Sequence, residues 1–99
     1  MSYWILHNMR PKQASYFEYA AWIETNNRRI DFSQIGDVEI VSEFRGVDHS
    51  DDADPPLLFE TIVSGGVLDG LKWQYSTLGE VKRGHHEAVA EVKAADRSH

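Results

Sequence analysis

Hydrophobic and polar residues alternate along much of the chain, and this alternation predicts β-strands. In residues 37–45, Val38, Ile40 and Phe44 fall on one face, while Glu39, Val41, Glu43 and Arg45 fall on the other. Such a period of two residues is typical of a strand with one buried face. By the same criterion and by β-branched and aromatic content, five segments are predicted as strands: residues 3–7, 28–33, 37–45, 57–64 and 71–76.

Two other segments have the spacing of amphipathic helices and a recognisable start. Ser15 and Glu18 stand three residues apart, as do Thr77 and Glu80, and each pair fits a capping box. The apolar residues that follow recur at intervals of three and four, which predicts helices ending near residues 25 and 95. Turns between strands are predicted at Gly36, at Gly65-Gly66 and at Asp69-Gly70.

These elements predict an α+β fold: an antiparallel β-meander of about four to five strands with two helices packed on one face. The 99 residues are enough for one hydrophobic core, so we expect a single domain over residues 1–99, with a frayed tail at about 96–99. The chain contains no cysteine, which excludes disulfides, thiolate zinc sites and thiol nucleophiles.

The second face of the meander then has to be explained, because no predicted helix covers it. Its central strands would display an apolar centre with carboxylates around it, formed by Glu39, Val41, Glu43, Leu58, Glu60 and Ile62. An exposed apolar patch with a polar rim usually marks an interface. A slip of one residue in the facing of either strand would instead scatter the patch.

The charge distribution changes this picture, because the acidic residues are concentrated near the same strands. The formal net charge is −6, and residues 37–60 alone carry eight acids against one base. The negative potential of this segment disfavours contact with phosphate backbones and anionic membranes. We therefore expect no direct contact with nucleic acid or with a membrane, and we expect a basic protein partner instead. A negative surface that only maintains solubility is the alternative. The predicted partner-binding residues are Glu39, Glu43, Asp48, Asp51, Asp52, Asp54, Glu60 and Ile62.

Catalytic or metal chemistry finds little support in the sequence. His49 and His85, with an aspartate of the acidic loop, could be imagined as a zinc site, but no two histidines share the i, i+4 spacing of one helical face. The aspartates from Asp48 to Asp54 lack the spacing and glycine of a calcium loop. No serine lies in a nucleophile turn. We therefore expect no enzyme activity, no metal and no cofactor.

Several short motifs occur in a characteristic order: Ile35-Gly-Asp-Val38, Phe44-x-Gly46-x-Asp48-His49, Pro56-Leu-Leu-Phe-Glu-Thr61, Tyr75-Ser-Thr77 and Gly84-His85. Together they resemble a family of small proteins encoded by bacteriophages and prophages. The chain departs from that pattern at Glu43, Arg45 and Gln74, all of which alter charge on the sheet. The resemblance implies either a structural or a functional role for Asp48, His49, Glu60 and His85.

By size, acidity and this resemblance, the sequence is similar to anti-CRISPR proteins. It thus predicts a phage-encoded inhibitor of bacterial defence in the host bacterial cytoplasm, one that binds a basic surface of a CRISPR effector complex through an acidic face. The alternative is a non-enzymatic structural or accessory phage protein that could form a homodimer through the same face. A metal-dependent enzyme using His49 and His85 is a third reading.

Overall fold

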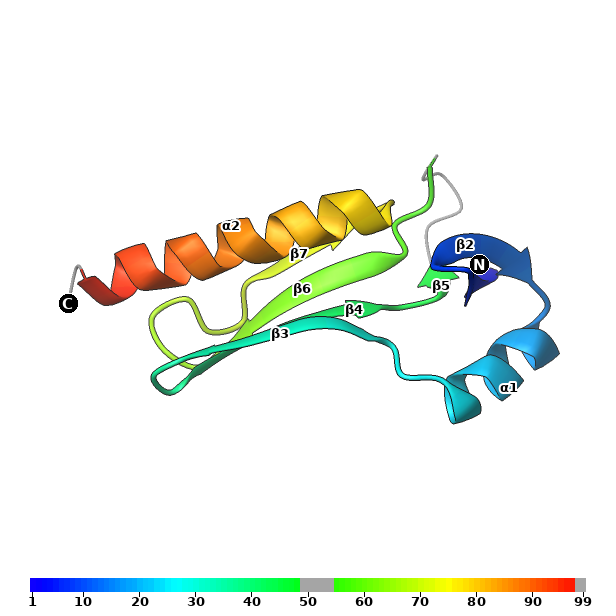
Figure 1. Ribbon diagram of the computed structural model, residues 1–99, viewed down its shortest axis with the longest axis horizontal. Helices are drawn as coiled ribbons and strands as arrows, with labels where there is room; N and C mark the ends of the chain where they lie inside the picture. The colour runs from blue at the N-terminus through cyan, green and yellow to red at the C-terminus, as the bar shows by residue number, and fades with distance from the viewer. Residues whose placement is uncertain (49–54, 98–99) are drawn as a thin grey trace.

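The computed structural model describes residues 1–48 and 55–97 (Figure 1). Nine elements follow one another along them: β1 (Ser2–His7), β2 (Arg10–Ala14), α1 (Tyr16–Thr25), β3 (Arg29–Ile35), β4 (Val38–Phe44), β5 (Val47–Asp48), β6 (Phe59–Ser64), β7 (Lys72–Tyr75) and α2 (Leu78–Arg97). All strand pairings are antiparallel. The predicted α+β class is therefore confirmed.

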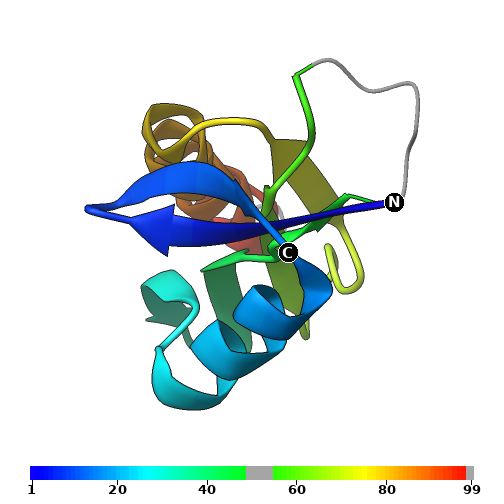
Figure 2. The same cartoon turned by 90° about the vertical axis from the view of Figure 1, so that its right-hand side faces the viewer.

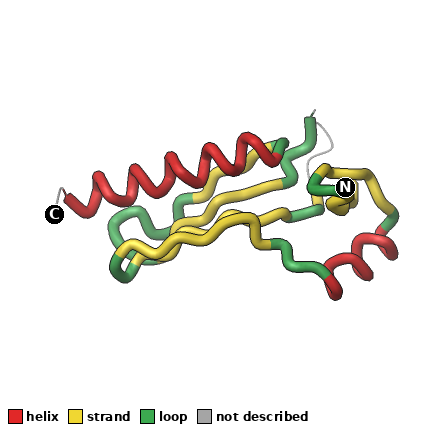
Figure 3. The backbone as a smooth tube through the Cα atoms, in the orientation of Figure 1, coloured by secondary structure: helices red, strands yellow, loops and turns green. Residues whose placement is uncertain are grey.

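The larger sheet is the predicted meander, with four strands in the order β3-β4-β6-β7. Gly36, with a positive φ of 58°, allows the tight hairpin that places Ile35 opposite Val38. Helix α2 lies along one face of these strands (Figure 3). It begins at the predicted cap, where the Glu80 backbone N–H donates to the Thr77 hydroxyl at 3.1 Å.

The N-terminal strands form a second sheet, which the sequence analysis did not predict. β1 pairs with β2 and with the two-residue strand β5, giving the order β2-β1-β5. Pro11 has no backbone N–H to donate, yet it lies in β2 opposite Leu6. β2 is an edge strand, and its outer side pairs with no other described strand. A proline there can therefore lack an N–H without removing a hydrogen bond of the sheet.

The two helices do not share a face, which corrects that part of the prediction. α1 contacts β1 and β2, whereas α2 contacts the four strands of the larger sheet. In Figures 1 and 2 the two helices lie on opposite sides of the strands. The physical reason is visible in the side chains: no residue of α1 is fully buried, while α2 buries a continuous stripe against the sheet. The frayed tail expected at about 96–99 is wrong for Asp96 and Arg97, which belong to α2, and residues 98–99 lie outside the described residues.

The core consists of two apolar clusters along the length of α2. The first is formed by Ile40, Val63, Ala88 and Val92, the second by Phe44, Leu58, Phe59 and Val81. Trp4, Leu6 and Trp22 from the N-terminal elements pack against the second cluster and so join the two sheets. Leu58 was predicted on the uncovered face, but it is only 1% exposed inside this cluster. Its position just before β6, where the N-terminal elements cover the sheet end, explains the error.

Candidate functional site

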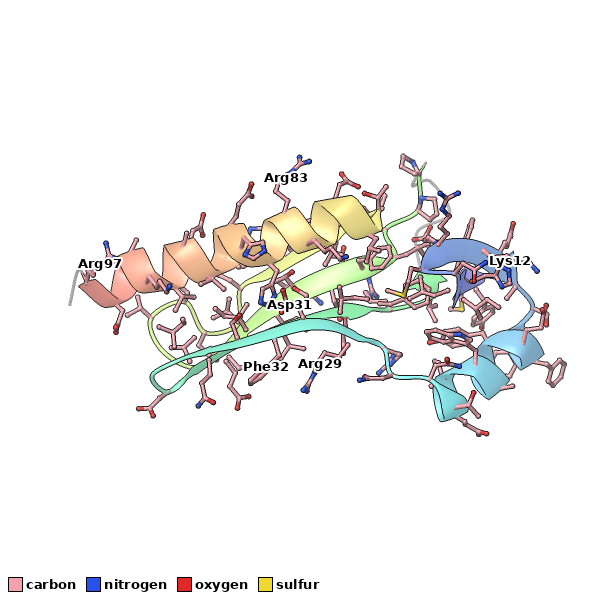
Figure 4. The ribbon with its side chains drawn as sticks, in the orientation of Figure 1. Lys12, Arg29, Asp31, Phe32, Arg83 and Arg97 are labelled. Atoms are coloured by element: carbon pink, nitrogen blue, oxygen red, sulfur yellow. The ribbon has the colours of Figure 1, made fainter. Side chains whose placement is uncertain are left out.

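The face of the larger sheet that points away from α2 is here called the outer face. Strand register places Phe32 opposite Val41, Val41 opposite Ile62, and Ile62 opposite Lys72. One side chain from each of the four strands therefore forms a row across this face. Phe32 is 40% exposed, and Val41 and Ile62 are half-buried. Figure 4 shows Phe32 pointing away from α2.

A second row, of charged residues, runs beside the apolar one. Arg29 lies opposite Glu43, and Glu43 lies opposite Glu60. Two carboxylates directly opposite each other repel, so this arrangement needs nearby cations. The Glu60 carboxylate has Arg45 Nε at 3.5 Å and Lys72 Nζ at 4.0 Å. Glu60 is only 8% exposed, so we assign it a role in holding the outer face together.

Among the described residues, the outer face carries charges of both signs. Its carboxylates are Glu39, Glu43 and Glu60, and its cations are Arg29, Arg45 and Lys72. Only Arg45 belongs to the acidic segment; the other two cations come from β3 and β7. The sequence analysis did not pair β3 and β7 in register with their neighbours, and only that pairing places Arg29 and Lys72 on this face.

Phe32 is the aromatic residue of this face that sequence reasoning missed. Regular alternation in the predicted strand 28–33 would put Ile30 and Phe32 on one face, but a β-bulge between Arg29 and Asp31 separates them. Ile30 packs against the second core cluster, whereas Phe32 turns outward. The Arg29 guanidinium lies over the Phe32 ring at 5.0 Å, a cation–π contact that holds both side chains on the outer face.

Asp48 is the one other predicted partner-binding residue that the structure describes, and it belongs to the smaller sheet. Asp48 lies in β5 opposite Ser2 and is 6% exposed. Asp51, Asp52, Asp54 and His49 lie outside the described residues. Of the eight predicted partner-binding residues, the structure thus brings together Glu39, Glu43, Glu60 and Ile62.

His85 is the centre of a buried polar layer on the other face, between the two apolar clusters. Its ring is 1% exposed. Nδ1 lies 2.7 Å from the Ser42 hydroxyl, which lies 2.6 Å from that of Thr61, and Nε2 lies 2.9 Å from the Ser33 hydroxyl. Both nitrogens of the His85 ring thus lie within hydrogen-bond distance of strand hydroxyls.

Burial lowers the pKa of His85 below its ordinary value, while Asp31 raises it and His86 lowers it further. Asp31 Oδ1 lies 3.8 Å from His85 Nε2 and points toward α2 from β3 (Figure 4). Asp31 and Ser33 approach Nε2 while Ser42 lies on Nδ1, and His85, Ser42 and Thr61 are at most 1% exposed. The layer thus resembles a structural network that ties α2 to three strands. Glu60, on the outer face, is not part of it.

The described residues were also searched for a metal site and for a membrane-spanning helix. Among them, no group of three or more histidines or carboxylates could hold a metal ion. Neither helix in this part of the chain is long and apolar enough to cross a bilayer.

No protein-family model, curated protein or solved structure matches the chain. The resemblance to bacteriophage proteins accordingly stays a prediction from the motifs.

Proposed function

We propose that this protein is a non-catalytic, phage-type inhibitor of a bacterial defence complex, acting in the host cytoplasm, and that it binds the complex through the outer face. The observation that carries the proposal is the apolar row of Phe32, Val41 and Ile62, which no described helix covers. A charged row in fixed register borders it. An apolar centre with an ordered polar rim is the usual anatomy of a protein interface.

In this proposal, charge acts at long range, on the approach of the two proteins, and at short range, in the contact itself. The net charge of −6 would steer the protein toward a basic region such as the nucleic-acid channel of an effector complex. At close range the outer face presents both positive and negative side chains, so the binding surface of the partner needs charged residues of both signs around its apolar centre. Glu39 and Glu43 remain on this face for direct contact, whereas Glu60 is committed to Arg45 and Lys72.

The test uses two phenylalanines of this chain. Phe32→Ser removes the exposed end of the apolar row, and Phe17→Ser removes a ring that is 82% exposed on α1, away from the larger sheet. Each tagged protein is used to capture its partner from bacterial lysate, and inhibition of the recovered complex is measured. We expect Phe32→Ser to weaken binding by about tenfold to a hundredfold, because apolar interface centres contribute most of the affinity.

The control Phe17→Ser is expected to bind as the unchanged protein does. A nucleic-acid-binding defence complex that is captured and inhibited equally by both variants would contradict the outer face as the contact. A Glu39→Lys, Glu43→Lys double variant tests the rim in the same assay. Glu60 is unsuitable for charge reversal, because a lysine there would put three cations together in a partly buried site.

A homodimer remains the second candidate, because a charge-balanced face can be complementary to itself. In a two-fold dimer Glu39 and Glu43 could each meet a cation of the second copy. Light scattering during size exclusion separates the two functions. A concentration-independent dimer that Phe32→Ser converts to a monomer would favour self-association, and a monomer in both proteins would favour a foreign partner.

A further inference from the structure

A groove of about 360 Å³ lies next to the outer face, where three parts of the chain meet. The β1–β2 turn forms one wall, the end of α1 a second and the start of β3 a third. Its apolar lining comes from Leu6, Met9, Trp22 and Ile30, and its polar lining from three asparagines and Arg29. Half of the lining residues are thus apolar and half polar, which suits an occupant that has both an apolar and a polar group.

Met9 occupies an unusual backbone conformation at the edge of this groove. Asn8 and Met9 are the non-glycine residues with positive φ among those described, at 52° and 64°. Asparagine tolerates this region, whereas methionine adopts it only rarely, and glycine is the usual residue at the second position of such a hairpin turn. The thioether side chain is nevertheless 53% exposed and lines the groove. Strain of this kind is found where a side chain has a function.

Arg29 gives the groove its charge, as the one charged residue of the lining. The same guanidinium stacks on Phe32 at 5.0 Å, so it stands where the groove and the outer face meet. An occupant therefore meets an aromatic and thioether wall at Trp22 and Met9 and a fixed cation at the mouth. An aromatic ring suits the first, since thioethers contact ring edges favourably, and a carboxylate suits the second.

We propose that this groove binds a peptide segment of a protein partner in which an aromatic side chain is followed by a carboxylate side chain. The inference rests on the proposed function for the occupant being a protein. The aromatic ring fills the space between Met9, Trp22 and Ile30, and the carboxylate pairs with Arg29. A partner bound on the outer face could place such a segment without a gap, because Arg29 belongs to both surfaces.

The test uses the free protein and short blocked peptides, so that its failure is distinguishable from failure of the outer face to bind a complex. The chain has two methionines, and methyl labelling therefore gives one signal from the groove and one reference signal from Met1. The probes are acetyl-Gly-Phe-Glu-Gly-amide and its Phe-Gln, Phe-Lys and Ala-Glu counterparts. We expect the Phe-Glu peptide to shift the Met9 methyl and Trp22 indole signals with a millimolar affinity.

Three variants make the result decisive. Arg29→Gln should weaken the Phe-Glu peptide by roughly tenfold and leave the Phe-Gln peptide unchanged, because only the former has a carboxylate. Met9→Gly relieves the positive-φ strain while removing the groove wall, so loss of binding there cannot be attributed to unfolding. Arg83→Gln, on the solvent side of α2 (Figure 4), should change nothing. Equal shifts from all four peptides, or none from the Phe-Glu peptide, would overturn the proposal.

Discussion

His85 shows how one residue can divide a core and still stabilise it. A histidine in an apolar stripe would normally be costly, but strand hydroxyls on either side of the ring satisfy both nitrogens. In the described residues no buried side-chain nitrogen or oxygen lacks a hydrogen-bond partner. The network also specifies register, because Ser42 and Thr61 must lie opposite each other beneath the ring.

The lowered pKa of His85 predicts a pH dependence of stability. The unfolded chain binds the proton at higher pH than the folded one, so stability is fully present above about pH 6.5 and is lost as pH falls through the folded pKa. One such group changes the free energy of unfolding by at most about 1.4 kcal/mol per pH unit. Urea denaturation at a series of pH values measures this slope.

Two neighbouring variants isolate the histidine responsible. His85→Gln should remove the part of the slope that lies just below pH 6.5, even though the variant is less stable overall. His86→Gln alters an exposed ring beside it and should leave most of that slope in place. An unchanged slope in His85→Gln would show that other groups, such as carboxylates, control acid unfolding.

At the residue scale, strand parity predicted most of the outer face correctly. Glu39, Val41 and Glu43 alternate with Ile40, Ser42 and Phe44 as expected, since β4 is regular along its length. Parity failed at Phe32, beyond a bulge, and at Leu58, outside the strand. Bulges and strand ends depend on tertiary packing, which a periodic pattern does not contain.

At the scale of elements, local signals and the larger sheet were predicted correctly, whereas the smaller sheet was missed. Both predicted capping boxes are present, and at the first the Ser15 hydroxyl and Glu18 carboxylate exchange hydrogen bonds with backbone N–H groups. These are contacts between residues three apart, so the sequence displays them directly. Strands β2 and β5 were missed, because one contains a proline and the other is only two residues long.

The approach of α2 to β7 depends on a glycine in the helix. A Cβ atom at Gly84 would collide with the ring of Tyr75, whereas one at Gly79, in the same helix, would meet nothing within 4 Å. We expect Gly84→Ala to lower the free energy of unfolding by roughly 1–3 kcal/mol, as overpacked cores do. Gly79→Ala should raise it by about 0.4–1 kcal/mol, through the smaller entropy of the unfolded chain.

Chemical denaturation of the two variants measures both effects against the unchanged protein. The opposite signs are the informative result, because both substitutions add the same methyl group to one helix. If Gly84→Ala were as stable as Gly79→Ala, α2 would not be held against Tyr75 in solution as closely as the structure shows.

At the scale of the whole molecule, the central question is how two sheets act as one body. The chain measures 47 × 29 × 20 Å, an elongated shape with the smaller sheet and α1 near one end (Figure 1). The two parts meet at the second core cluster, where Phe44 lies 5.4 Å from Trp22 and 5.3 Å from Phe59, measured between ring centroids. Phe44 thus contacts α1 and β6 at once.

This connection predicts that the chain unfolds as a single cooperative unit, as the expectation of one domain requires. In a Trp73→Phe background, tryptophan fluorescence reports on Trp4 and Trp22 in the N-terminal elements, while far-ultraviolet circular dichroism is dominated by α2. Coincident urea transitions for the two signals are expected, because a two-state domain gives the same midpoint by every probe.

The role of Phe44 is then tested in the same background. Phe44→Ala should cost roughly 3–5 kcal/mol and should separate the two signals, with fluorescence changing at lower urea, because the contact between the parts is lost. Val92→Ala, in the first cluster, is the matched control: it should lower stability while both signals still coincide. Separate transitions in the Trp73→Phe protein without a further substitution would mean that the N-terminal elements form a unit of their own. The groove between them and β3 would then open and close independently of the outer face.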